Sequence, residues 1–170
     1  MKNIREHISC DINTGILIWI KPTANRVKVG SIAGYMSKVD GYVRFHYKGK
    51  TYLAHRVVWY FMYGVWPIKL LDHEDEIKHH NWGSNLREAT DQQNQWHKGV
   101  GIANTSGYKG VHKDKNSKKW RAQINHNGKH QHLGCFDTAK EAAEMYLLSA
   151  ERIHKEFLHR SLVDKLCKLL

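Results

Sequence analysis

The chain has little that would cross-link it or hold it in a membrane. Its 170 residues include two prolines and three cysteines. Cys10, Cys135 and Cys167 are odd in number and far apart, which argues against a disulfide framework and against a paired-cysteine zinc site. No apolar run approaches the roughly 18 residues that a membrane-spanning helix needs, and the first residues, MKNIREHISC, do not form a signal peptide. We therefore expect a cytoplasmic protein with no structural zinc and no membrane partner.

Acidic residues are also few. Lysine and arginine number 27 against 16 aspartate and glutamate, which gives a net charge of +11 and a pI near 9.6. The 13 histidines can add positive charge as the pH falls. Such a chain attracts polyanions: DNA, RNA or acidic membrane surfaces. Its length allows one domain or two small ones, and its hydrophobic content of 41% is compatible with folded cores.

Residues 1–53 are typical of short strands. Ile16–Ile20 is an apolar run that follows a turn signal, and apolar residues alternate with polar ones over Val43–Tyr47. A helix is predicted from Arg56 to Tyr63, ended by Gly64. This β-rich region has no catalytic signature. We expect it to flank the site and to offer basic side chains to DNA, the alternative being a merely solvated basic sheet face.

The stretch that carries chemistry is 70–98, LLDHEDEIKHHNWGSNLREATDQQNQWHK. Its two leading apolar residues indicate the end of a short strand, which delivers Asp72 and His73 at the strand's edge. A polar loop follows, and a second short strand is predicted to begin at Asn85. Helix-start signals come at Thr90. The pattern therefore predicts two strands followed by a helix.

The predicted helix presents Asn94 one turn after its start. The carboxylate of Asp72 and the amide oxygen of Asn94 are hard oxygen ligands of the kind that Mg²⁺ accepts. His73 is placed to deprotonate a water molecule for attack on phosphorus. A carboxylate, an imidazole and a carboxamide in this order suit the hydrolysis of phosphodiester bonds.

This segment resembles the HNH nuclease motif, a ββα-metal finger, in the form carried by phage and intron homing endonucleases. Asn85-Leu86-Arg87 begins twelve residues after His73, and Asn94 follows nine residues after Asn85. The resemblance implies that Asp72 and Asn94 hold one divalent ion, Mg²⁺ or Mn²⁺, and that His73 is the general base. It also implies that Asn85 supports the loop and holds the His73 ring. The remaining matches are Ala54, His55, Arg56, Val57, Val58, Trp59, Gly64, Pro67, Asn81 and Thr90.

The segment departs from the motif at three places. Glu76-Ile77 stands where relatives often carry Gly-Asn, and Trp82 stands where an arginine is frequent. The resemblance therefore implies that one phosphate contact is missing. His97 occupies a position where a second asparagine is common, and it is a candidate spare ligand or phosphate contact.

Residues 99–105 contain glycine and no apolar periodicity, and we predict a linker there, between a nuclease domain 1–98 and a second domain 106–170. In the second domain we expect three antiparallel strands, the last two joined at Asn127-Gly128, and then a helix. That helix begins at Thr138 with a capping pattern. After it, a helical tail is predicted by the spacing of Leu162, Val163, Leu166 and Leu169, and this tail packs on the domain or mediates dimer contacts.

The alternation of the second strand predicts an apolar face against the helix and an exposed face of basic and amide side chains. Arginine recognises guanine edges in a major groove, and glutamine or asparagine recognises adenine. Residues 106–157 resemble the AP-two/ethylene-response-factor DNA-binding domain, through Tyr-Lys-Gly-Val, Trp-Arg-Ala, Leu-Gly-x-Phe and Glu-Ala-Ala. The DNA-facing positions that this resemblance implies are Lys109, His112, Gln123, Asn125, His130 and His132, with Arg121 beside them.

The sequence thus predicts an α+β protein that is a site-specific, homing-type DNA endonuclease of phage or mobile-element origin. One centre of this kind cuts one strand per event, so we expect a nicking enzyme, monomeric or weakly dimeric, acting on double-stranded DNA. RNA is disfavoured because its major groove is deep and narrow. Two alternatives are a non-catalytic DNA-binding regulator and a broad-specificity nuclease.

Overall fold

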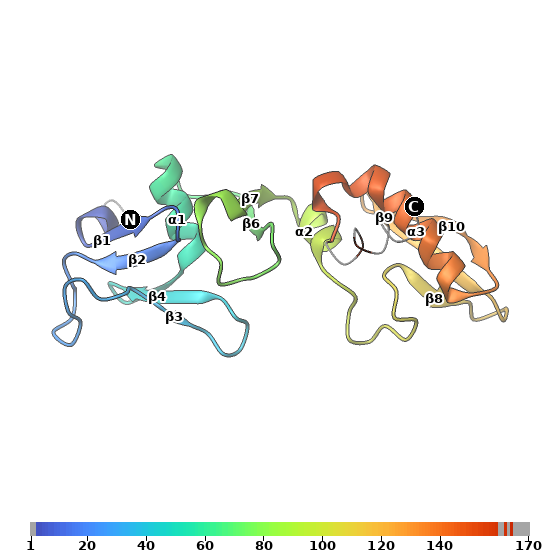
Figure 1. The fold of residues 1–170 in the computed structure, drawn as a ribbon, viewed down its shortest axis with the longest axis horizontal. Helices are drawn as coiled ribbons and strands as arrows, with labels where there is room; N and C mark the ends of the chain where they lie inside the picture. Colours follow the sequence, from blue (N-terminus) through green and yellow to red (C-terminus); the bar gives the residue numbers. More distant parts are fainter. Residues whose placement is uncertain (1–2, 160–161, 163, 165–170) are drawn as a thin grey trace. The chain divides into compact units, whose positions relative to one another are not determined.

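The computed structural model describes residues 3–159, 162 and 164. The chain divides into two compact units, Met1–Ala89 and Thr90–Leu170 (Figure 1). Both units combine short helices with antiparallel sheets, which confirms the predicted α+β class. No helix among the described residues has both the length and the apolar character that crossing a membrane requires.

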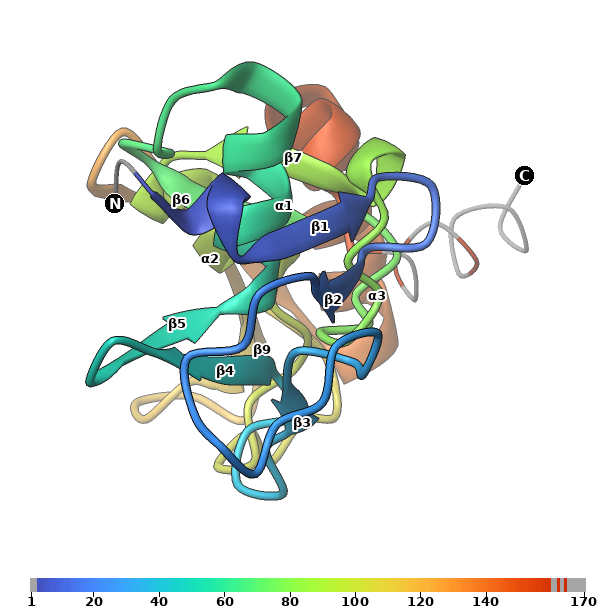
Figure 2. The ribbon, with the colours of Figure 1, turned by 90° about the vertical axis from the view of Figure 1, so that its left-hand side faces the viewer.

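The first unit contains three small sheets. Strands β1 and β2 form a hairpin, β3, β4 and β5 form a three-stranded sheet, and β6 pairs with β7 (Figure 2). Helix α1 packs against β4, β5 and the 3₁₀ turn η2. In chain order the elements are η1 Ile4–Glu6, β1 Ile8–Asp11, β2 Ile16–Trp19, β3 Tyr35–Met36, β4 Val43–Tyr47, β5 Lys50–Leu53, α1 Ala54–Tyr63, β6 Leu70–His73, η2 Gly83–Asn85 and β7 Leu86–Ala89.

The core of the first unit follows the predicted patterns. In β4, Phe45 and Tyr47 are buried and His46 between them is exposed, as the alternation predicts. Helix α1 buries Val57 and Val58 in the same cluster, which also contains residues from β1, β2 and β7. The helix ends at Gly64, whose φ of 74° is in the left-handed region that favours glycine. One core therefore joins the N-terminal β-rich region to the β6–β7 hairpin.

A close backbone approach joins the first hairpin to the loop between β6 and β7. Gly15, in the turn after β1, has φ of 71°, and a Cβ there would lie 2.2 Å from the carbonyl carbon of Asn81. Nearby, the amide of Gly83 donates to the carbonyl of Ile12 at 2.8 Å. The N-terminal hairpin therefore supports the loop that follows Asp72 and His73.

The second unit begins with helix α2, and its sheet has the strand order β10-β9-β8, antiparallel throughout. Helix α3 packs on all three strands, which confirms the predicted three-stranded sheet on one helix (Figure 1). Residues 99–105, the predicted linker, form no helix or strand in the structure. The elements are α2 Asp91–His97, β8 Val111–Lys113, β9 Trp120–His126, β10 Lys129–Phe136, α3 Ala139–His154 and η3 Lys155–Phe157.

Local signals in the second unit act as predicted. Asn127 and Gly128 have φ of 51° and 71°, the left-handed pair that a two-residue hairpin turn between β9 and β10 requires. The side chain of Thr138 accepts from the amide of Glu141 in a complete capping box that starts α3. Of the predicted C-terminal tail, Leu162 is buried in the core of this unit; Val163, Leu166 and Leu169 lie outside the described residues.

Candidate functional site

Asp72 and His73 end strand β6, and both are buried in the first unit, with 7% and 5% of their surface exposed. The register of the hairpin places Asp72 opposite Arg87 and His73 opposite Leu86. The Nε and Nη2 atoms of Arg87 each lie 3.0 Å from Oδ2 of Asp72. The negative charge of the Asp72 carboxylate is therefore balanced by Arg87 on the neighbouring strand.

The His73 ring is held by Asn81. Its Nε2 lies 3.1 Å from Oδ1 of Asn81, and both side chains are buried. A carboxamide oxygen only accepts hydrogen bonds, so Nε2 must carry the proton in this contact. The neutral ring then has its lone pair on Nδ1, which is the nitrogen that can accept a proton.

Two further rings enclose His73. The rings of His55 and His73 meet edge to face with centroids 5.1 Å apart, and Tyr42 lies 6.0 Å from His73. Burial lowers the pKa of His73, and the hydrogen bond to Asn81 and the charges of Asp75 and Asp72 oppose this shift only in part. Burial, together with His73 and Arg56, lowers the pKa of His55 to about 3. Both imidazoles are therefore neutral near pH 7, as a general base must be.

Asn85 organises the loop rather than the His73 ring. Its Nδ2 donates to Oδ1 of Asp75 at 2.9 Å and to the carbonyl of His80 at 2.7 Å, and its Oδ1 accepts from the amide of Asp75 at 2.9 Å. Asp75 also bonds Nδ1 of His80 at 2.6 Å. The loop-supporting role expected of Asn85 is thus seen, whereas the ring-holding role that the resemblance assigned to it belongs to Asn81.

Asn94 lies on α2, in the second unit, whereas Asp72, His73 and Asn85 lie in the first. Helix α2 starts at Thr90 with a complete capping box to Gln93, as the start signals predict. The Asn94 side chain is half-buried. His97, the residue of undecided role, is buried, and its ring lies 6.1 Å from that of His159 within the second unit.

The donor chemistry at Asp72 suits a hard divalent cation. The buried carboxylate offers oxygen atoms of the kind that hard divalent cations prefer, and Arg87 pairs with one of them, Oδ2. Among the described side chains, no group of three or more His, Cys, Asp or Glu could hold a metal ion. An ion at Asp72 would therefore need amide or phosphate oxygens as further ligands, which is the kind of set that Mg²⁺ takes beside a substrate.

The polar face of the second unit forms as predicted. The register pairs His112 with Arg121, His132 with Gln123, and His130 with Asn125. Paired residues share a face, and it is the face opposite Ala122 and Ile124, which are buried under α3. Six of the seven predicted DNA-facing residues are therefore on one surface: His112, Arg121, Gln123, Asn125, His130 and His132.

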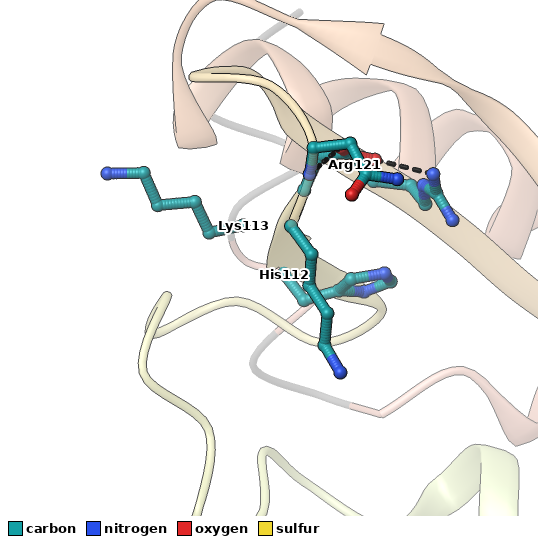
Figure 3. Close-up of a pocket in the computed structure, with 6 residues that line it drawn as sticks. His112, Lys113 and Arg121 are labelled. Atoms are coloured by element: carbon teal, nitrogen blue, oxygen red, sulfur yellow. Dashed lines mark hydrogen bonds and ion pairs between the residues drawn. The ribbon is translucent and has the colours of Figure 1, made fainter.

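Lys109 does not join these six residues on the strands, because it precedes β8 and its Nζ donates to main-chain carbonyls of Gln95 and Trp96. Arg121, on the polar face itself, pairs with Asp114 and lines a pocket with His112. In Figure 3, Lys113 extends away from Arg121. The ion pair with Asp114 orients the Arg121 guanidinium beside the pocket.

Comparisons with known proteins bear on the segment that carries this site. A family model described as HNH endonuclease matches residues 52–96. The uncharacterised HNH endonuclease L560 of Acanthamoeba polyphaga mimivirus is 32% identical over 131 residues, which are 76% of this chain and 67% of the relative. A solved structure described as DNA binding and cleavage by the HNH homing endonuclease I-HmuI is also similar. The alignment covers 81% of this chain and 76% of the chain in that structure, with 26% identity and a TM-score of 0.40.

Proposed function

Because this chain belongs to the HNH endonuclease family, we propose that it is a site-specific, homing-type endonuclease that hydrolyses DNA phosphodiester bonds with His73 as general base. The observation that carries this proposal is the state of the His73 ring. It is buried beside Asp72, and its Nε2 is engaged by Asn81. Nδ1 is thereby left as the basic nitrogen. The net charge of +11 supports a nucleic-acid substrate.

The proposed reaction is a displacement at phosphorus. Nδ1 of His73 takes a proton from a water molecule as the water oxygen forms a bond to phosphorus, and the bond from phosphorus to the 3′ oxygen breaks. The leaving oxygen takes a proton from solvent, so the products are a 5′-phosphate and a 3′-hydroxyl. Asn81 holds the ring in the tautomer that this step needs.

Asp72 and Asn94 are the proposed ligands of one Mg²⁺ or Mn²⁺. When bound, the ion would neutralise charge on the scissile phosphate and on the leaving oxygen. The ion pair with Arg87 holds the Asp72 carboxylate at its position on β6. One such centre cuts one strand per event, so the proposed activity of a monomer is nicking.

Site specificity is proposed to come from the polar face of the second unit. Its amide and guanidinium groups are those that bind base edges in a major groove. The proposed origin of an enzyme that pairs cleavage with recognition is a phage or a mobile element. The mimivirus relative, a viral protein, supports this origin. The alternatives, a DNA-binding regulator and a broad-specificity nuclease, are outcomes of the test below.

The test compares wild type and His73→Ala on supercoiled plasmids with Mg²⁺ or Mn²⁺, one plasmid carrying the sequence that flanks the gene. His79→Ala is the matched control, because His79 lies in the same loop and is exposed. We expect relaxed circles from wild type and His79→Ala, a loss of about 100-fold or more for His73→Ala, and one mapped nick. Tight binding without cutting would favour the regulator, and cuts at many positions would favour the broad nuclease.

A further inference from the structure

Helix α2 is too short to be stable alone. It has seven residues, Asp91–His97, whereas isolated helices of fewer than about 12 residues are marginal in water. Its conformation must therefore come from what it packs on. In the structure those contacts are made with the rest of the second unit, including the turn η3.

Trp96 is the main anchor of this helix. Its indole stacks on His154 with ring centroids 4.6 Å apart and on His126 at 5.9 Å, with an interplanar angle of 18° in both cases. Its Nε1 donates to the carbonyl of Asn125 at 2.9 Å. Asn125 belongs to β9 and carries one of the exposed polar side chains of the sheet. The helix is thus bonded directly to the strand that is proposed to recognise DNA.

Lys109 is the second anchor. Its Nζ donates to the carbonyls of Gln95 at 3.0 Å, of Trp96 at 2.6 Å and of Lys98. These carbonyls are at the C-terminal end of α2, where the helix leaves acceptors unpaired and where a positive charge interacts favourably with the helix dipole. An ammonium group held in this way caps the helix.

We propose that Trp96 and Lys109 are positioning residues of the nuclease: they hold α2, and with it the proposed metal ligand Asn94, on the sheet of the second unit. The inference rests on the proposed role of Asn94 as a metal ligand. Asn94 precedes Trp96 by two residues on the same helix, and Asp72 and His73 belong to the other unit.

Positioning predicts a defect in metal use rather than in DNA binding. Residues that orient a ligand typically change metal affinity by about 10–100-fold when they are removed. For Trp96→Ala and Lys109→Met we expect the Mg²⁺ concentration for half-maximal nicking to rise by about tenfold, with metal-free DNA binding in EDTA changed less than twofold. Trp96→Phe keeps a stacking ring and loses only the bond to Asn125, so its defect should be intermediate.

The experiment has a control and a readout that does not depend on cleavage. Lys118→Met removes an exposed lysine of the same unit and should leave metal use unchanged. Hydrogen exchange of the α2 amides, measured in the full chain, should be equally slow in wild type and Lys118→Met. It should be faster in Trp96→Ala and Lys109→Met. Manganese binding measured by calorimetry should weaken in the same two variants, while melting temperature and circular dichroism show whether each variant folds.

The outcomes separate this inference from the proposed function. Unchanged metal dependence in both anchor variants, in the presence of faster exchange in α2, would overturn the positioning role. Unchanged exchange would overturn the anchoring itself. An inactive wild type would defeat the proposed function, whereas the exchange comparison would still decide whether the second unit holds α2.

Discussion

Arg87 and Asp72, opposite each other on paired strands, form a largely buried ion pair in which two guanidinium nitrogens approach one carboxylate oxygen at 3.0 Å. Only 17% of the Arg87 side chain and 7% of the Asp72 side chain are exposed. The pair places a compensated negative charge beside the imidazole of His73. The proposed metal ligand is therefore oriented by an ion pair within the first unit.

Removing the arginine should leave a buried carboxylate without this ion pair. We expect Arg87→Met to lower the free energy of unfolding by about 3 kcal/mol, measured by urea denaturation of the full chain. Arg26→Met removes an exposed arginine of the same unit and should change the free energy of unfolding by less than about 0.5 kcal/mol. Added Mn²⁺ should restore part of the loss, because the ion gives the carboxylate a new positive partner. Equal stabilities of the two variants would contradict this account of the pair.

Asn81 should matter through the tautomer of His73. Asn81→Ala removes the oxygen that accepts from Nε2, and we expect nicking to fall by about 10–100-fold. Asn81→Asp retains an acceptor at that position and should retain more activity than alanine does. Single-turnover rates on saturating DNA measure this effect apart from binding. If alanine and aspartate were equally impaired, the hydrogen bond would not be the reason for the defect.

Gly15 tests the contact between the first hairpin and the loop that contains Asn81. Gly15 and Gly49 have φ of 71° and 73°, but of these two a Cβ would clash only at Gly15, where the backbone of Asn81 lies at 2.2 Å. At Gly49, no atom of the described residues lies within 4 Å. Both alanine variants should lose about 1 kcal/mol of stability to backbone strain. Only Gly15→Ala should also reduce the nicking rate, because it must displace Asn81. Equal rates in the two variants would contradict the proposed support.

The stability of the second unit should depend on pH through His154. This side chain is 1% exposed, and neither ring nitrogen has a hydrogen-bond partner among the residues that the structure describes. Burial, with Lys109 and His126, lowers its pKa to about 4. Trp96 and Tyr146 are the other rings against it. The unfolded chain binds a proton below about pH 6.5, whereas the folded chain does so only below about 4. The stability that depends on a neutral His154 is therefore fully present above about pH 6.5, and it is lost as the pH falls towards 4.

We expect a loss of about 1–3 kcal/mol between pH 7 and pH 4.5. His55, whose pKa is lowered to about 3, titrates in the same direction in the first unit. The informative quantity is therefore the difference between wild type and His154→Leu in urea denaturation at the two pH values. The variant should show the smaller dependence, and the exposed His132→Ala should match wild type. A variant with the full dependence would exclude His154 as its source.

The recognition face can be tested within one sheet. Gln123 shares the polar face with His132, whereas Gln131, one strand away, pairs with Ile124 on the opposite face. Gln123→Ala should weaken binding to the mapped target by about 5–100-fold, the effect of one base contact. Gln131→Ala should bind as wild type does. Fluorescence anisotropy with target and scrambled duplexes distinguishes lost recognition from lost phosphate attraction, and equal effects of the two variants would argue against this face.

Much of the fold was predictable because its signals are local. The helix starts at Thr90 and Thr138, the turn at Asn127-Gly128 and the alternation in β4 each depend on a few neighbouring residues. The enzyme class was predicted from the resemblance of residues 70–98 to the HNH motif, and the comparisons confirm it. The polar face followed from a two-residue period, so it needed no knowledge of tertiary structure.

The contacts within the site were harder to predict from the sequence, because they join positions that are distant along the chain. Asn81 and Asn85 lie in one loop and are chemically identical, and only the folded loop decides that Asn81 contacts the His73 ring. The partnership of Arg87 with Asp72 needs the register of a hairpin whose loop is long and irregular. Lys109 was predicted to contact DNA, and nothing in the sequence near it indicates that α2 is its partner.

The anchoring of α2 determines where this protein could be joined to another recognition domain. A chimera with its junction in 99–105 would separate α2 from Asn125 and Lys109, and the grafted domain would have nothing to hold the helix. A junction between Ala89 and Thr90 would transfer the helix together with its anchors. In a lineage that exchanges domains by recombination, the heritable module is then a recognition sheet with the last helix of the nuclease motif attached to it.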